Sequence, residues 1–136
     1  MLKQVLVIDD DPVNNTIVQK LAEFSSLAEE VLTFVSAVDG LDFIQQAIDQ
    51  KRTPPEAIFL DINMPIVNGW GFLESFQAMN IDQYLDQVSI YMLTSSSEQS
   101  DINKAKQYKS VTDYIVKPIS VQKLREIRKQ HKSVTA

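Results

Sequence analysis

"IFLDINMPIVNGW", residues 58–70, sets a fully apolar run directly before an acidic residue and a turn. With Ala57 included, the run up to Leu60 is apolar at every position, which predicts a short strand buried on both faces near the middle of a parallel sheet. This strand ends at Asp61. The Asn68-Gly69 pair then predicts a turn, and a helix follows over residues 70–79. A buried strand that ends on a carboxylate needs a chemical reason.

The change from a short apolar run to a helical pattern recurs along the whole chain. Strands are predicted at residues 4–8, 31–35, 57–60, 88–93 and 113–116, and helices after Asp11-Pro12 and at about residues 41–50, 70–79, 98–108 and 120–130. Alternating strands and helices are typical of a parallel sheet, so the predicted fold class is α/β with five βα units. The 31–35 run alternates in polarity and is expected near the sheet edge.

Composition bounds the class of function. The 136 residues fit one domain, with 44% hydrophobic and 23% charged residues. The formal net charge of -5 argues against direct binding to nucleic acid or to an anionic membrane. Cysteine is absent, which excludes disulfides, thiolate zinc sites and thiol nucleophiles. Without a signal peptide or a membrane-length apolar run, we expect a cytoplasmic protein.

Polar side chains follow all five predicted strands, although the second strand offers only Ser36. The others are Asp9, Asp10 and Asp11 after the first, Asp61 after the third, Thr94 and residues 95–97 after the fourth, and Lys117 after the fifth. Because sites in open parallel sheets form at the carboxyl ends of the strands, these groups are expected to converge. Clustered carboxylates suit Mg²⁺, and a lysine with a hydroxyl can bind phosphoryl oxygens. Asp61 is the candidate nucleophile for an aspartyl-phosphate.

Four segments resemble the receiver domain of two-component response regulators. They are "VLVIDDD", "IFLDINMPIVNGW", "YMLTSSS" and "DYIVKP", in the order and at the spacings of that family. The resemblance implies a flavodoxin-like (βα)5 fold with strand order 2-1-3-4-5. It covers residues 1–131 and leaves residues 132–136 as a polar C-terminal tail.

The same resemblance implies a metal site and a phosphoacceptor. Asp61 would accept a phosphoryl group from a phosphohistidine of a sensor kinase or histidine phosphotransfer protein. Asp10 would bind Mg²⁺ directly and Asp9 chiefly through water, while Asn63 would offer its backbone carbonyl to the metal. Mn²⁺ would be able to substitute for Mg²⁺.

Further residues would respond to the phosphoryl group. Lys117 would pair with the acceptor and then with the phosphoryl oxygens, and Thr94 would move its hydroxyl toward them. Tyr114 stands at the position of the aromatic switch residue. Ser95 would leave room for phosphate entry, and Ser96 would tune attack by water. The Lys117-Pro118 peptide is expected to be cis.

The pathway and two other functions stay open from the sequence. The chain would act alone on an unknown downstream protein, pass phosphate along a relay, or belong to a hybrid histidine kinase. A phosphatase of the haloacid dehalogenase type also forms an aspartyl-phosphate, but its second acid would stand where this chain has Asn63. A pseudo-receiver that only scaffolds partners would not need the complete set of site residues.

Five side chains carry competing interpretations. Asp11 is expected to cap the first helix rather than bind metal, because Pro12 follows it. Asn14 and Asn15 would either frame the mouth of the site or solvate the start of that helix. His131 is expected to be solvated. Trp70 lies close enough to Asp61 in sequence to serve as a hypothetical fluorescent reporter of metal binding.

Overall fold

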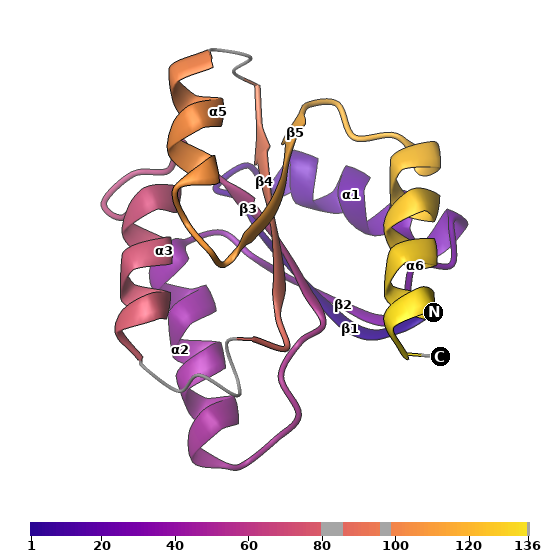
Figure 1. The fold of residues 1–136 in the computed structure, drawn as a ribbon, viewed down its shortest axis with the longest axis horizontal. Coiled ribbons are helices and arrows are strands. Elements are labelled where there is room, and N and C mark those ends of the chain that lie inside the picture. The colour runs from indigo at the N-terminus through magenta and orange to yellow at the C-terminus, as the bar shows by residue number, and fades with distance from the viewer. Residues whose placement is uncertain (80–85, 96–98, 136) are drawn as a thin grey trace.

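The computed structural model describes residues 1–79, 86–95 and 99–135. Its centre is a parallel sheet in the order β2-β1-β3-β4-β5, which confirms the expected topology (Figure 1). The strands are β1 (Leu2–Ile8), β2 (Ala28–Phe34), β3 (Ala57–Asp61), β4 (Ser89–Thr94) and β5 (Val111–Val116). All residues of β3 are buried, as the apolar run predicts for a central strand. β2 lies at an edge, also as predicted.

Helices cover both faces of the sheet. They are α1 (Pro12–Phe24), α2 (Ala37–Asp49), α3 (Gly69–Ala78), α5 (Gln99–Lys106) and α6 (Val121–Thr135). Figure 1 shows α1 and α6 on one face and α2, α3 and α5 on the other. Because strand side chains alternate, Ile58 and Leu60 pack into the core under α2 and α3, and Phe59 packs into the core under α1 and α6.

Three helices begin at side chains suited to that place. Asp11 caps α1, because its Oδ1 accepts a hydrogen bond from the Val13 N–H at 2.9 Å, and Pro12 occupies the first turn. Ser36 caps α2, and Asn68 caps α3 by accepting from the Gly71 N–H at 2.9 Å. The capping interpretation of Asp11 is therefore confirmed.

Several element boundaries differ from the predictions. β2 begins at Ala28 rather than residue 31, because an edge strand tolerates the exposed pair Glu29-Glu30. α2 begins at Ala37 rather than near residue 41, since Ser36 provides an earlier cap. α6 does not end near residue 130 but runs to Thr135, so residues 132–135 continue the helix.

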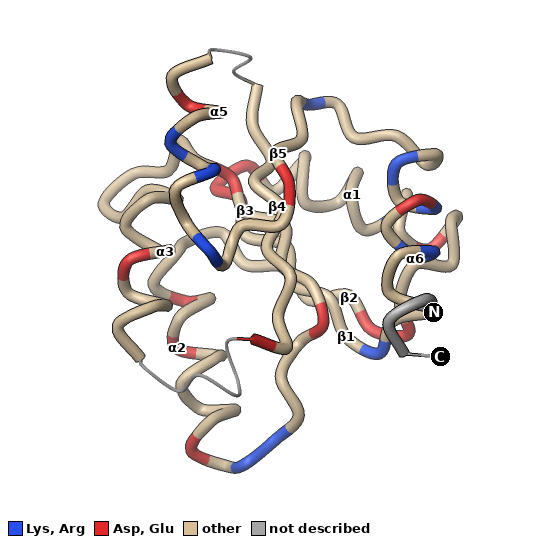
Figure 2. Tube along the Cα trace, viewed as in Figure 1, with Lys and Arg blue, Asp and Glu red and all other residues tan. Residues whose placement is uncertain are grey.

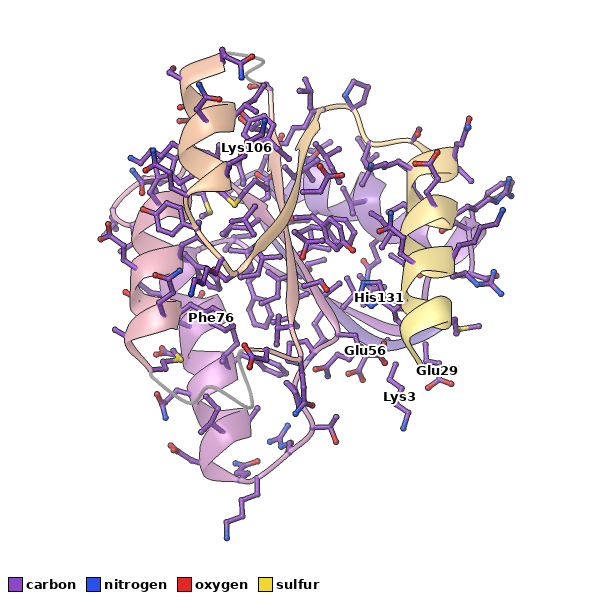
Figure 3. All side chains as sticks on the ribbon, viewed as in Figure 1. Lys3, Glu29, Glu56, Phe76, Lys106 and His131 are labelled. Carbon is purple, nitrogen blue, oxygen red and sulfur yellow. The ribbon has the colours of Figure 1, made fainter. Side chains whose placement is uncertain are left out.

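His131 is not solvated, and that prediction is wrong. It lies half-buried between α6 and the sheet (Figure 3), where its Nε2 is 3.1 Å from the hydroxyl oxygen of Tyr91. Burial lowers the pKa of the imidazole, while nearby Glu56 acts in the opposite direction. The contact fixes one turn of α6 against a strand residue that is itself buried.

Charged residues are distributed over several elements. Figure 2 shows Lys and Arg on α5, on α6 and after α2, with Asp and Glu interspersed among them. Within the part of the chain that the structure describes, no helix combines the length and apolar character needed to cross a bilayer.

Candidate functional site

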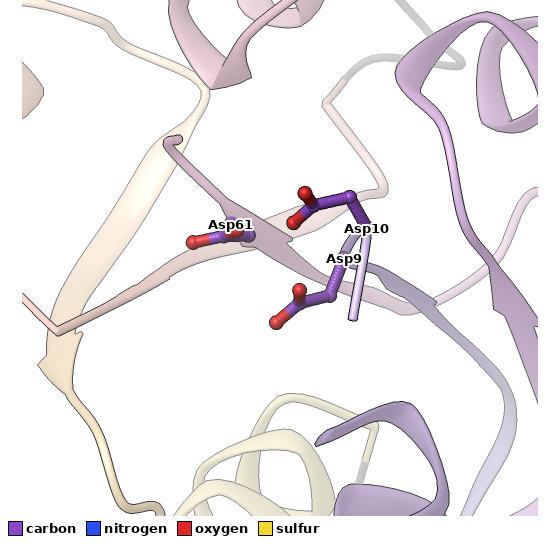
Figure 4. A group of neighbouring side chains, drawn as sticks. All are labelled: Asp9, Asp10 and Asp61. Atoms are coloured by element: carbon purple, nitrogen blue, oxygen red, sulfur yellow. The ribbon is translucent and has the colours of Figure 1, made fainter. Parts of the chain in front are cut away.

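Three carboxylates meet at the carboxyl ends of β1 and β3 (Figure 4). One oxygen from each of Asp9, Asp10 and Asp61 lies within 4.8 Å of the others. The parallel register pairs Ile8 with Leu60, so the residues that follow, Asp9 and Asp61, leave the two strands side by side. Asp9 is 1% and Asp61 6% exposed, whereas Asp10 faces solvent. The predicted convergence of the three acids is thus present.

This arrangement disfavours the ionised form of Asp61. Burial, together with the charges of Asp9 and Asp10, raises the pKa of Asp61 to about 6, although Lys117 partly opposes the shift. A cation placed among the three carboxylates would relieve that repulsion. Hard oxygen donors from one or two carboxylates, completed by water, are the ligands that Mg²⁺ takes in proteins. The donor set therefore fits Mg²⁺.

The Asp9 carboxylate accepts three hydrogen bonds from residues that the structure describes. Its Oδ2 accepts from the Lys117 ammonium and from the Asn14 side-chain amide, both at 2.7 Å. Its Oδ1 accepts from the backbone N–H of Asp11 at 2.9 Å. Because both oxygens are engaged by the protein, Asp9 is held in one orientation at the rim of the acidic cluster.

Lys117 reaches the cluster from the connection between β5 and α6. Its Nζ lies 3.6 Å from Asp61 Oδ1, farther than from Asp9. Burial acts to lower the pKa of Lys117, but the hydrogen bond to Asp9 and the charges of Asp61 and Asp9 outweigh it, so the pKa lies above its ordinary value. The Lys117 N–H donates to the Thr94 carbonyl at 2.6 Å. The Lys117-Pro118 peptide is cis, as expected.

The other predicted site residues differ in burial. Thr94 ends β4 and is fully buried, while Ser95 follows it and is exposed. Tyr114 lies on β5, half-buried against the core under α3 and α5. Asn63 is exposed in the connection after β3. Ser96 lies outside the described residues.

Gly69 closes that connection against the acceptor strand. Its N–H donates to the Ile62 carbonyl at 2.8 Å. A Cβ at this position would lie 2.6 Å from the Asp61 carbonyl oxygen and 2.9 Å from the Ile62 Cα, both backbone atoms. Only glycine lets α3 start this close to the end of β3.

Asn14 and Asn15 belong to the site, and the sequence left their role open. The Asn14 amide binds the Asp9 carboxylate. Asn15 is buried, and its Nδ2 donates to the Asp9 carbonyl at 2.9 Å and to the Phe34 carbonyl at 3.3 Å. The available signal was their position five and six residues after Asp9, in the first turn of the helix that follows the acids.

Trp70 turns toward α5. Its ring stacks on Tyr108 with centroids 5.8 Å apart, and Lys104 Nζ lies 4.7 Å from the Trp70 ring centroid. Phe72, in contrast, is fully buried in the core. Trp70 directly follows Gly69, whose N–H donates to the Ile62 carbonyl.

Comparison with known proteins decides the family. The family model described as the response regulator receiver domain matches residues 5–129. The chain belongs to this family. A solved structure of a two-component response regulator from Cytophaga hutchinsonii resembles this receiver domain with a TM-score of 0.88 and 25% identity, covering 97% of this chain and 98% of that one.

Curated relatives of this receiver domain differ in length. The probable C4-dicarboxylate response regulator DctR of Halalkalibacterium halodurans is 29% identical over 98% of the chain, which spans 53% of that protein. Hybrid signal transduction histidine kinase L of Dictyostelium discoideum is 30% identical over 96% of the chain, which spans 7% of that protein. The chain therefore spans about half the length of the first relative and a small part of the second.

Proposed function

We propose that this receiver domain accepts a phosphoryl group on Asp61 in a Mg²⁺-dependent reaction. The observation that carries the proposal is the cluster of three carboxylates within 4.8 Å, with the Lys117 ammonium in ion-pair distance of two of them. The donor would be a phosphohistidine of a sensor histidine kinase or of a histidine phosphotransfer protein in the cytoplasm. Residues 1–131 would form the phosphorylated unit.

Asp9, Asp10 and Asp61, with the backbone carbonyl of Asn63, would hold the metal. Bound Mg²⁺ would neutralise negative charge on the carboxylates and on the incoming phosphoryl oxygens. Mn²⁺ offers a similar preference for oxygen ligands. Charge neutralisation also leaves Asp61 ionised at neutral pH, the state in which its oxygen is a nucleophile.

Transfer would replace one bond to phosphorus by another. A carboxylate oxygen of Asp61 bonds to phosphorus as the P–N bond to the donor histidine breaks, and the imidazole leaves with the bonding electrons and takes up a proton. Lys117 is placed to bind a phosphoryl oxygen, because its Nζ is already 3.6 Å from an Asp61 oxygen. Ser95 is exposed, which supports the proposal that this small side chain would leave room for the phosphoryl group to approach Asp61.

Phosphorylation would change the surface through Thr94 and Tyr114. Thr94 sits at the end of β4 beside the acceptor strand, since Asp61 pairs with Leu93 in the register of the sheet. A hydroxyl drawn to the phosphoryl group would vacate space for Tyr114 on β5. Such contacts shift a two-state equilibrium only by the difference they make between the two states. The affected face, formed by α5, β5 and α6, would bind the downstream protein.

Solitary action, a step in a phosphorelay and a place in a hybrid kinase are three alternative settings for this chemistry. A place in a hybrid kinase is supported by the likeness to kinase L of Dictyostelium discoideum. Direct binding to nucleic acid or membrane is not part of the proposal, given the net charge of -5.

The test is labelling with acetyl phosphate. We expect the wild-type chain to gain one hydroxylamine-labile phosphoryl group in Mg²⁺ and none in EDTA, and Asp61→Asn to gain none while its circular dichroism is unchanged. Asp11→Asn is the matched control, because it removes an exposed acid and keeps a good helix cap. Undiminished labelling of Asp61→Asn would refute the acceptor assignment.

Turnover of a phosphate ester and binding of Mg²⁺ are the measurements that separate the competing functions. Steady release of phosphate from a phosphate ester, with Asp61 required, would favour a phosphatase of the haloacid dehalogenase type. That enzyme class needs a second acid where this chain has Asn63. Failure to bind Mg²⁺ and to accept phosphate would favour a pseudo-receiver scaffold.

A further inference from the structure

Asn14 makes a contact with the acidic cluster that the phosphorylation scheme does not use. Its Nδ2 donates to Asp9 Oδ2 at 2.7 Å, the same oxygen that accepts from Lys117 Nζ at 2.7 Å. One carboxylate oxygen therefore has two nitrogen donors, one neutral and one charged. The two donors come from separate elements, α1 and the connection that follows β5.

The two donors differ in what else they contact. Lys117 also faces Asp61, with Nζ 3.6 Å from Oδ1, so it is shared between the two acids. In the proposed reaction Lys117 turns further toward Asp61 to bind a phosphoryl oxygen. Asp9 then loses part of its charged partner. Asn14 is not shared in this way among the contacts that the structure describes.

Residues at the start of α1 donate several hydrogen bonds to Asp9. The Asp11 N–H donates to Asp9 Oδ1 at 2.9 Å, and Asn15, which is buried, donates to the Asp9 carbonyl at 2.9 Å. Asn14 completes this set by donating a hydrogen bond to the other carboxylate oxygen, Oδ2. Side chain and main chain of Asp9 are thus fixed by one helical turn, whose own start is capped by Asp11.

We propose that Asn14 is a positioning residue, which holds the Asp9 carboxylate in its metal-facing orientation when Lys117 moves to the phosphoryl group. The inference rests on the proposed Mg²⁺ site. Partners that orient the carboxylates of a metal site change metal affinity even though they never contact the ion. Asn14 would therefore affect Mg²⁺ binding through the Asp9 carboxylate, and phosphorylation only through Mg²⁺ binding.

Calorimetric titration with Mg²⁺ tests the role. We expect Asn14→Leu to bind Mg²⁺ about 10-fold more weakly than wild type, the lower end of the usual effect of losing such a partner. Gln19→Leu is the matched control, because Gln19 is on the same helix and its amide binds the Val31 carbonyl, remote from the acids. Gln19→Leu should keep the wild-type affinity. Equal affinities of Asn14→Leu and wild type would overturn the role.

A second variant pair separates positioning from a general effect on α1. In a Lys117→Met background Asn14 is the sole remaining side-chain donor that the structure shows on Asp9 Oδ2, so Asn14→Leu should weaken Mg²⁺ binding by a larger factor there than in the wild type. A purely structural role predicts the same factor in both backgrounds, and that result would contradict the proposal.

A measurement without metal checks the hydrogen bond itself. In EDTA, the side-chain amide protons of Asn14 should exchange with solvent more slowly than those of the exposed Asn103. Exchange at the same rate would overturn the contact. If wild type binds no Mg²⁺, the proposed function fails together with the positioning role; if wild type binds Mg²⁺ and Asn14→Leu binds it equally well, the positioning role alone fails.

Discussion

Lys117 is bound to Asp9 more closely than to Asp61, the proposed acceptor. Its Nζ lies 2.7 Å from Asp9 Oδ2 and 3.6 Å from Asp61 Oδ1. The lysine therefore offsets the charge of both acids while leaving the acceptor oxygen without a close ammonium contact. In the proposed reaction, a short displacement of Nζ would turn this partner of Asp9 into a ligand of the phosphoryl group.

Removal of this shared cation should destabilise the metal-free protein. Lys117→Met leaves two buried carboxylates facing each other, and we expect a loss of about 1–3 kcal/mol in the free energy of unfolding. Urea denaturation in EDTA measures it. Lys123→Met is the control, because the Lys123–Asp113 pair is exposed and such pairs contribute about 0–1 kcal/mol. Equal losses in the two variants would contradict this account.

The acidity of Asp61 predicts a pH-dependent stability. Its pKa is about 6 in the folded protein, above the ordinary 3.8, so the folded state binds a proton more readily between these values. Stability should therefore fall as the pH rises from about 4 to 6, and the penalty is complete above that window. Asp61→Asn removes the penalty. At pH 7.5 in EDTA we expect the variant to gain about 1 kcal/mol after allowance for screening by solvent, or roughly 4 °C in Tm.

The same variant supplies its own controls. At pH 4 the wild-type carboxyl is largely protonated, so the gain of Asp61→Asn should shrink toward zero. Saturating Mg²⁺ at pH 7.5 should also reduce the gain, because the metal stabilises only the chain that retains its three acids. A gain that is the same at pH 4 and pH 7.5 would argue against a strained carboxylate.

Two glycines of α3 should respond differently to alanine. At Gly69 the new Cβ would meet backbone atoms of Asp61 and Ile62, so we expect Gly69→Ala to cost about 1–3 kcal/mol and to slow labelling by acetyl phosphate. At Gly71 the nearest atom is a side-chain carbon of Val67 at 3.0 Å, which is able to move. Gly71→Ala should change stability by less than about 1 kcal/mol, since alanine favours the helix. Urea denaturation of both variants checks the contrast.

Trp70 should report on the acidic site by fluorescence. It is the single tryptophan of the chain. It directly follows Gly69, whose N–H donates to the carbonyl of Ile62, the residue after Asp61. Binding of Mg²⁺ is expected to change its emission, and EDTA should reverse the change. Lys104→Met should alter the emission of the metal-free protein, because Lys104 lies over the ring, while Lys106→Met should not. Emission insensitive to Mg²⁺ would show that the site and Trp70 are not coupled.

The α/β class and the convergence of the acids were predictable from short-range patterns, whereas the strand order followed from the family resemblance. A strand apolar at every position must be buried on both faces, which places β3 at the centre. Parallel strands bring their carboxyl ends to one edge, so Asp9, Asp61, Thr94 and Lys117 had to approach each other. The family motifs added the cis Lys117-Pro118 peptide, which no pattern of polarity would have indicated.

Contacts between side chains distant in sequence were not predictable in the same way. His131 is paired with Tyr91, forty residues away, and a polar surrounding sequence gave no sign of the burial. Asparagine in the first turn of a helix is ordinary, so the binding of Asn14 to Asp9 had no distinctive pattern. The start of β2 was missed because an edge strand need not be apolar.

The contact between His131 and Tyr91 has a practical meaning for the limits of the folded unit. The family match ends at residue 129, yet α6 continues beyond it and His131 covers a tyrosine that is 1% exposed. A fragment cut at the end of the family match would uncover Tyr91 and shorten the helix that packs on β1 and α1. We therefore expect the folded unit to extend beyond residue 129, and a fragment designed for expression should include His131 and the rest of α6.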